Sequence, residues 1–67
     1  MKNKKLKTKM FEMGVTHKQV AALLGINAKV FTNKINKITI NGYEAKFTKA
    51  EKVVLSLKFD IPEEEIE

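Results

Sequence analysis

The chain has 67 residues, of which 43% are hydrophobic, and this composition favours one folded domain over residues 1–67 rather than a disordered tail. It has no Cys and a single His, which excludes disulfides and a zinc site, and it lacks the run of ~20 apolar residues that a membrane span needs. The net charge of +5 is uneven, because residues 1–40 hold nine Lys and one acid whereas residues 41–67 hold four Lys and seven acids. A basic half of this kind permits a polyanionic partner without establishing one, since a solvated surface has the same pattern.

The first predicted helix covers residues 3–13. Leu6, Met10 and Met13 recur at helical spacing and would line one face, with lysines on the other faces. Gly14 supplies the left-handed position that commonly ends a helix. We expect the lysines of this segment to form either a solubilising helix face or an arm along a nucleic-acid groove.

Two helices joined by a short turn are predicted next. Thr16 followed by Gln19 is the capping-box pattern that starts a helix, and Gly25 ends this helix. Asn27 is a good N-cap for the following helix, which we expect over residues 28–36. Because a glycine turn breaks the helix axis, the two helices must cross in the helix-turn-helix geometry. The side chains expected to face the core are Val20, Leu23 and Leu24 in the first of these helices, and Phe31 and Ile35 in the second.

Residues 36–47 contain the dipeptide Asn41-Gly42, a strong signal for a tight hairpin turn. If the chain folds back there, the apolar side chains lie on one face and the polar ones on the other. The facing pairs are then Ile40 with Tyr43, Ile38 with Ala45 and Asn36 with Phe47. The segment is therefore expected to be a short β-hairpin or an ordered loop without strand pairing.

Another capping box, Thr48 with Glu51, predicts a helix after this segment. Its expected buried stripe is Ala50, Val53, Val54 and Leu57, and Phe59 with Ile61 would close the core. Pro62 begins a short final helix anchored by Ile66. The predicted fold class is mainly α, with four to five short helices, a helix-turn-helix and a possible short hairpin between the third and fourth helices.

Residues 17–31, HKQVAALLGINAKVF, resemble the helix-turn-helix of the phage Cro and repressor (XRE-type) family. The matching positions are Ala21 at the helix crossing, Gly25 and Ile26 in the turn, and Phe31 as the inward anchor. The resemblance extends over residues 3–66, including the stretch from Phe59 to Glu64. It implies a transcriptional regulator that binds double-stranded DNA sequence-specifically, with a recognition helix over about 28–36 in the major groove.

The chain departs from this family in two places. The connection after the recognition helix is long and hairpin-like, and Lys34 stands where an apolar residue is common, with Ile35 taking the inward role. A hairpin after the recognition helix is also a feature of winged helix-turn-helix proteins. A winged, excisionase-like DNA-binding protein is therefore an alternative.

The resemblance also implies which residues meet DNA. Those that would read base edges are Asn27, Ala28, Lys29, Thr32 and Asn33. Those that would contact phosphates are His17, Lys18, Gln19, Lys34 and Lys37. Asn33 suits adenine, Lys29 can donate to guanine, and the methyl group of Thr32 suits thymine, so we expect an operator with readable A·T pairs. Asn27 has helix capping as its first role.

Other function classes are less favoured. The single His and single Ser give no nucleophile–base pair, and the acids at 63–65 suit a helix start, so we expect no enzyme, no cofactor and no metal. The serious rival is a helix-turn-helix scaffold used for protein–protein interaction, as an antirepressor or adaptor.

The expected partners follow from the size of the domain. A monomer this small reads few base pairs, so we expect a homodimer, at least on DNA. Its surface would come from the fourth helix, the final helix or the hairpin. We expect no small-molecule effector, no membrane partner and a cytoplasmic location.

Overall fold

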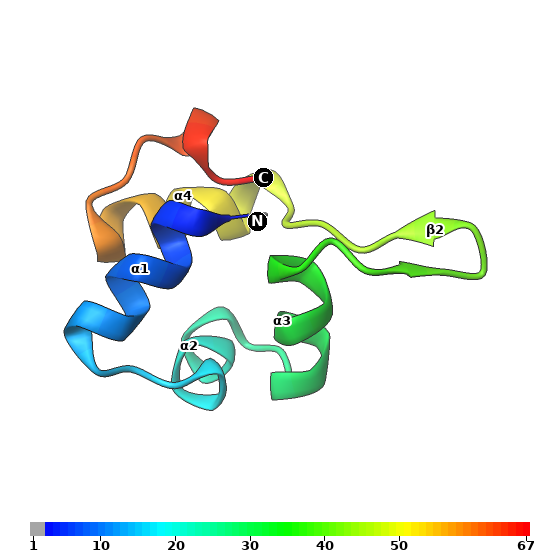
Figure 1. The fold of residues 1–67 in the computed structure, drawn as a ribbon, viewed down its shortest axis with the longest axis horizontal. Helices are drawn as coiled ribbons and strands as arrows, with labels where there is room; N and C mark the ends of the chain where they lie inside the picture. Colours follow the sequence, from blue (N-terminus) through cyan, green and yellow to red (C-terminus); the bar gives the residue numbers. More distant parts are fainter. Residues whose placement is uncertain (1–2) are drawn as a thin grey trace.

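The computed structural model describes residues 3–67, so residues 1 and 2 of the expected domain lie outside the described part. The helices and strands are α1 (Lys4–Met13), α2 (His17–Leu24), α3 (Ala28–Ile35), β1 (Thr39–Ile40), β2 (Tyr43–Glu44), α4 (Lys49–Phe59) and the 3-10 helix η1 (Glu63–Glu65). In Figure 1 the helices gather into one body, and the hairpin of β1 and β2 projects away from it. The prediction of a mainly helical fold with a hairpin between the third and fourth helices is confirmed.

Local hydrogen bonds fix the starts of α2 and α4. The Thr16 hydroxyl accepts from the backbone N–H of Gln19 at 3.2 Å, and the Gln19 side chain accepts from the N–H of Thr16 at 2.8 Å. Thr48 and Glu51 make the same reciprocal pair at 3.2 Å and 2.9 Å. Both predicted capping boxes are confirmed, so these helix boundaries are encoded within four-residue segments.

The core receives side chains from all four α-helices and from the segments on either side of α4. The buried apolar residues are Leu6, Met10, Val20, Ala21, Phe31, Ile35, Phe47, Leu55, Phe59, Ile61 and Ile66. The ring of Phe47 lies 5.6 Å from that of Phe31, which fixes the base of the hairpin against α3. The predicted inward positions of Phe31, Ile35, Phe59, Ile61 and Ile66 are confirmed.

The buried face of α4 differs from the predicted one. Of the stripe expected at Ala50, Val53, Val54 and Leu57, Leu57 is 81% exposed, Ala50 and Val54 are exposed, and Val53 is partly buried. The core is filled instead by Leu55 and Phe59, one turn apart on the helix row that begins with Glu51. This row looks solvent-facing in the sequence because it starts with a carboxylate. Glu51 tolerates the inward position because Lys34 pairs with it.

Two further residues expected in the core, Met13 and Leu23, are exposed. Met13 is the last residue of α1, directly before the left-handed Gly14, where the chain leaves the helix. In α2 the inward positions are taken by Val20 and Ala21, which turns Leu23 toward solvent. The small side chain of Ala21 faces inward where a longer one would hold the neighbouring helix further away.

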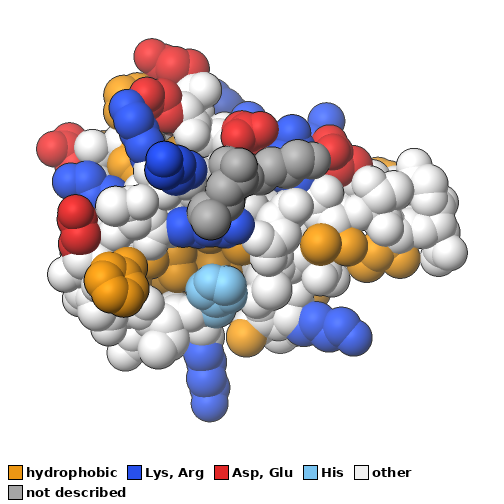
Figure 2. All heavy atoms as spheres, in the orientation of Figure 1, with side chains coloured by type: hydrophobic (Ala, Val, Ile, Leu, Met, Phe, Trp, Pro, Cys, Tyr) orange, Lys and Arg blue, Asp and Glu red, His pale blue; other side chains and the backbone are white. Residues whose placement is uncertain are grey.

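The hairpin has the predicted register at its tip. Ile40 pairs with Tyr43 and Thr39 with Glu44, and the N–H of Ala45 donates to the carbonyl of Ile38 at 2.9 Å. The expected pair of Asn36 with Phe47 does not form, because Asn36 ends α3 and the left-handed φ of 51° at Lys37 turns the backbone there. Ile38, Ile40 and Tyr43 are all exposed, and Figure 2 shows hydrophobic side chains along one side of the projection.

Asn3 connects three parts of the chain and is fully buried. Its side-chain N–H donates to the carbonyl of Ile35 at 2.8 Å, and its side-chain oxygen accepts from the N–H of Glu67 at 2.7 Å. One amide therefore joins the start of α1, the end of α3 and the segment after η1. Asn3 is also the N-cap residue of α1, with a left-handed φ of 56°, but its side chain makes no capping hydrogen bond.

We predict that Asn3→Ala lowers the free energy of unfolding by about 1–3 kcal/mol, because it leaves the buried carbonyl of Ile35 and the partly buried N–H of Glu67 without partners. Urea unfolding followed by circular dichroism measures the loss. Asn33→Ala removes the same group from a partly exposed position and should change stability by less than about 0.5 kcal/mol. Equal effects of the two substitutions would contradict the role assigned to Asn3.

Candidate nucleic-acid interface

The turn between α2 and α3 is fixed by short-range bonds. Gly25 has the left-handed φ of 75° that the turn requires, and the N–H of Ile26 returns to the carbonyl of Ala21 at 3.0 Å. The Asn27 side chain accepts from the N–H of Val30 at 2.8 Å, which is the predicted N-cap. Ile26 packs against the core, and Ala21 is buried. The helix-turn-helix is thus held rigidly on its inner side.

His17 and Thr32 connect the first residue of α2 to the middle of α3. The His17 Nδ1 lies 2.8 Å from the Thr32 hydroxyl oxygen, and the His17 ring meets Phe31 edge-on with centroids 5.3 Å apart. Both residues are partly exposed. His17, predicted to bind a phosphate, and Thr32, predicted to read a base, are therefore in direct contact with each other on one surface.

Lys7 and Asn36 extend this contact toward α1, and neither belongs to the predicted site. The Lys7 ammonium donates to the side-chain oxygen of Asn36 at 2.6 Å, and the Asn36 side-chain N–H donates to the backbone carbonyl of Thr32 at 3.1 Å. The sequence signal for Asn36 is its spacing of one helical turn from Thr32. Lys7 gives no such signal, because its partner lies far along the chain. Figure 2 shows the chain's single His at the surface of this face, with Lys side chains above and below it.

The remaining predicted base-reading residues lie along α3. Lys29 is exposed and Asn33 partly exposed, and they stand four residues apart, so they belong to one helix row. Within residues 3–67, neither side chain makes a hydrogen bond or ion pair. Asn27 is exposed but committed to its cap, and Ala28 is partly exposed. The row of Lys29 and Asn33 is thus the part of α3 with polar groups free to meet a ligand.

The predicted phosphate contacts divide into two groups. Lys18 and Gln19 are exposed at the start of α2, although the Gln19 oxygen is used by its capping box. Lys34 pairs with Glu51 at 2.8 Å, and the exposed fractions of their side chains are only 18% and 12%. Lys37 lies 3.8 Å from Glu44 and 3.7 Å from Glu67. Lys34 and Lys37 therefore have acidic partners within the chain, which weakens their expected role toward phosphate.

The charge of this surface is one-sided. Residues 13–43, which include α2 and α3, hold four Lys and one His but no Asp or Glu. Three acids of the second half pair with Lys34 and Lys37 of this segment. Other acids pair with lysines elsewhere in the fold, as in Lys5 with Glu65 and Lys49 with Glu63. Within residues 3–67, the positive charges of the helix-turn-helix that have no acidic partner are therefore those of Lys18 and Lys29.

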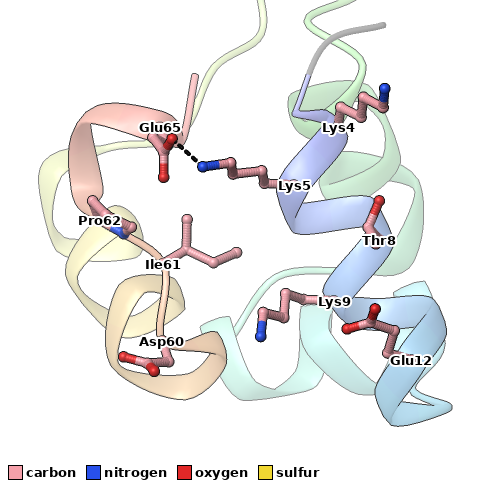
Figure 3. Close-up of a pocket in the computed structure, with 9 residues that line it drawn as sticks. All are labelled: Lys4, Lys5, Thr8, Lys9, Glu12, Asp60, Ile61, Pro62 and Glu65. Carbon is pink, nitrogen blue, oxygen red and sulfur yellow. Dashed lines mark hydrogen bonds and ion pairs between the residues drawn. The ribbon is translucent and has the colours of Figure 1, made fainter.

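A hollow in the described part of the chain lies away from this surface. It measures about 540 Å³ and is lined by α1 and by the segment from Asp60 to Glu65 (Figure 3). Its lining carries three lysines and three acids, and the ion pair between Lys5 and Glu65 crosses it. Such a balanced lining has no preference for an anion or a cation, so it does not compete with the positive surface as a polyanion site.

Comparison of the chain with protein-family models, with curated proteins and with solved structures finds no match. The resemblance to the Cro and repressor family therefore stays a prediction. Within residues 3–67, no helix has the length and apolar character to cross a membrane. The same residues bring together no group of three or more His, Cys, Asp or Glu side chains that would hold a metal ion.

Glu51 has a lowered pKa. Burial alone would raise the pKa of this carboxyl group, but the hydrogen bonds and charge of Lys34 and the hydrogen bonds from Thr48 outweigh burial. A carboxylate whose pKa is lower in the folded state stabilises the fold above its ordinary pKa. That stabilisation is lost as the pH falls through the folded-state pKa.

We predict that Glu51→Gln lowers the free energy of unfolding by about 1–2 kcal/mol at pH 7, because Lys34 loses its charged partner while Gln still completes the capping box. The difference from the parent chain should shrink as the pH falls below the ordinary Glu pKa of about 4.3 and through the lowered folded-state pKa of Glu51. Urea unfolding at a series of pH values measures both effects. Glu12→Gln, at an exposed position of α1, is the control. A difference in the free energy of unfolding that stays constant as the pH falls until the parent chain itself unfolds would contradict the account.

Proposed function

We propose that this chain is a sequence-specific double-stranded DNA-binding protein that regulates transcription in the manner of the Cro and repressor family, with α3 in the major groove. The observation that carries the proposal is the acid-free helix-turn-helix whose outer row, Lys29 and Asn33, has no partner within the described chain. An amide and an ammonium group on one helix face are suited to the acceptor and donor groups of base edges. A rigid inner side and a free polar outer side are what a reading helix needs.

The proposed division of labour follows the surroundings of each residue. Lys29 and Asn33 read bases directly, and Ala28 and the Thr32 methyl group give apolar contact to thymine. Phosphates are held by His17, Lys18 and the free amide N–H groups of Gln19, beside the N-terminus of α2. Lys34 and Lys37 have secondary roles in this proposal because each must first leave a carboxylate. Asn27 acts as the cap that positions the reading row.

The projecting hairpin favours a second version of the proposal, a winged helix-turn-helix of excisionase-like type. In that version the hairpin follows the reading helix onto the DNA backbone, and the exposed Lys46 contacts a phosphate. The two-residue strands are short for a wing, so the Cro-like version is preferred. In both versions the protein works in the cytoplasm, without a small-molecule effector and as a homodimer on DNA.

We predict that in vitro selection from random duplexes enriches a two-fold symmetric site rich in A·T pairs. Binding to that site should weaken steeply with salt, because phosphate contacts release counterions. Lys29→Ala and Asn33→Ala should each cost about 1–3 kcal/mol and relax base preference at one position. Lys18→Ala should weaken binding to all sequences alike and lower the salt slope by about 1. Lys58→Ala, an exposed lysine of α4, is the control.

The outcomes separate the function classes. If Lys46→Ala weakens DNA binding as much as Lys18→Ala does, the winged version is favoured. Weak binding that is indifferent to sequence, or no binding at moderate salt, would reject the proposal in favour of a protein-interaction scaffold.

We predict that two chains bind each selected duplex, since one domain of this size reads too few base pairs for useful specificity. Sedimentation velocity of the protein–duplex complex measures the stoichiometry. A half-site duplex should bind one chain and at much lower affinity. Full affinity for the half-site would show that the protein reads DNA as a monomer.

A further inference from the structure

The contact between His17 and Thr32 has a property that the other contacts of the interface lack, because one of its members is an imidazole, a group that has a neutral and a protonated form. Imidazole in general gains a proton between pH 8 and pH 5, whereas a Thr hydroxyl has one proton and two lone pairs at any pH in this range. The 2.8 Å separation of Nδ1 and the hydroxyl oxygen requires one of the two to donate to the other. The direction of that bond decides what Thr32 can offer outward.

The neutral state has a defined direction if His17 also contacts DNA. A phosphate oxygen only accepts, and Nδ1 is already occupied by Thr32, so the ring must donate to phosphate through Nε2–H. Nδ1 is then the acceptor, and the Thr32 hydroxyl proton points toward it. The outward side of the hydroxyl carries only lone pairs, which suit the amino groups of adenine and cytosine in the major groove.

Protonation reverses the bond. Both ring nitrogens of an imidazolium donate, so Nδ1–H must donate to the Thr32 oxygen. The hydroxyl proton is then displaced from the ring and can donate outward, which suits O4 of thymine, O6 and N7 of guanine, or N7 of adenine, but not cytosine, which has no acceptor on this edge. We infer that His17 is a specificity-determining residue whose protonation state selects which bases Thr32 accepts, an inference that rests on the proposed DNA-binding function.

The surroundings of His17 support an effect on hydrogen-bond direction rather than on ion pairing. Lys7 of α1 lines the same shallow hollow as the ring, Lys18 follows it in α2, and α3 presents Thr32 and the Phe31 edge. The segment of residues 13–43 that holds the ring and its α3 neighbours contains no acid. Within residues 3–67 the ring makes no ion pair, so its gained proton has the Thr32 oxygen as its described acceptor.

Selection of duplexes at pH 5.5 and at pH 8.0 tests the inference, with circular dichroism confirming that the protein is folded at both. At the position read by Thr32, the preference should move from cytosine at pH 8.0 to thymine or guanine at pH 5.5, whereas adenine, with both an amino group and N7, fits both states. The ratio of affinities for matched duplexes that differ at this position should change about tenfold, the worth of one hydrogen bond. The added charge alone would raise affinity for all sequences without changing that ratio.

Two variants isolate the mechanism. His17→Gln keeps a polar group but cannot titrate, so its base preference should be the same at both pH values. Thr32→Val keeps the methyl group and loses the hydroxyl, so it should bind without either preference. Lys18→Gln removes a neighbouring charge and should keep the pH-dependent change in ratio.

The failures are distinguishable. If no duplex is enriched at either pH, the proposed function is wrong and the inference falls with it. If one site is enriched with the same preference at both pH values, the Thr32 hydroxyl does not donate to a base after its proton leaves the ring. The inference alone is then overturned. A pH-dependent change of ratio that persists in His17→Gln would also overturn it.

Discussion

Lys34 and Glu51 join the end of α3 to the start of α4 with little contact with water. Two opposite charges in such a place must stay together, because a single one left there would lack both solvent and partner. The pair turns the helix row of Glu51, Leu55 and Phe59 inward, so the two apolar members of that row fill the core. The same bond holds α4 against the helix that we propose to read DNA. The ion pair thus contributes both to core packing and to the placement of α3.

The interface depends on a second constraint, which is that the inner side of α3 is fully occupied. The turn through Gly25 and the cap at Asn27 fix its start, and Phe31 and Ile35 are buried along it. Thr32 is held from two directions, through its hydroxyl by His17 and through its carbonyl by Asn36. What remains on the outer side is preorganised, so binding would require little further ordering of the helix.

Features that depend on neighbouring residues were predictable from the sequence, and features that depend on distant ones were not. The capping boxes, the Asn27 cap and the Asn41-Gly42 hairpin each arise within a few residues, and all are present. The buried face of α4 was not predictable, because the predicted stripe and the row of Leu55 and Phe59 both have helical spacing. The partner that lets Glu51 of that row face inward, Lys34, lies in another helix. The row of Lys29 and Asn33 follows from α3 alone. Glu51 and Glu67, which pair with Lys34 and Lys37, lie far along the chain, so the sequence pattern could not identify them; Glu44, the other partner of Lys37, lies in the hairpin that follows it.

Asn3 links the start and the end of the described chain to the end of α3. Its side chain makes hydrogen bonds to Ile35 and Glu67 at the same time. The first turn of α1, the last turn of α3 and the segment after η1 are therefore joined through one side chain. Opening the first turn of α1 breaks both hydrogen bonds and leaves the Ile35 carbonyl and the Glu67 N–H without this partner. These segments should therefore exchange their amide protons as one cooperative unit rather than fray separately. Opening of the hairpin at its turn breaks the pairing of β1 with β2 and leaves both hydrogen bonds of the Asn3 side chain in place.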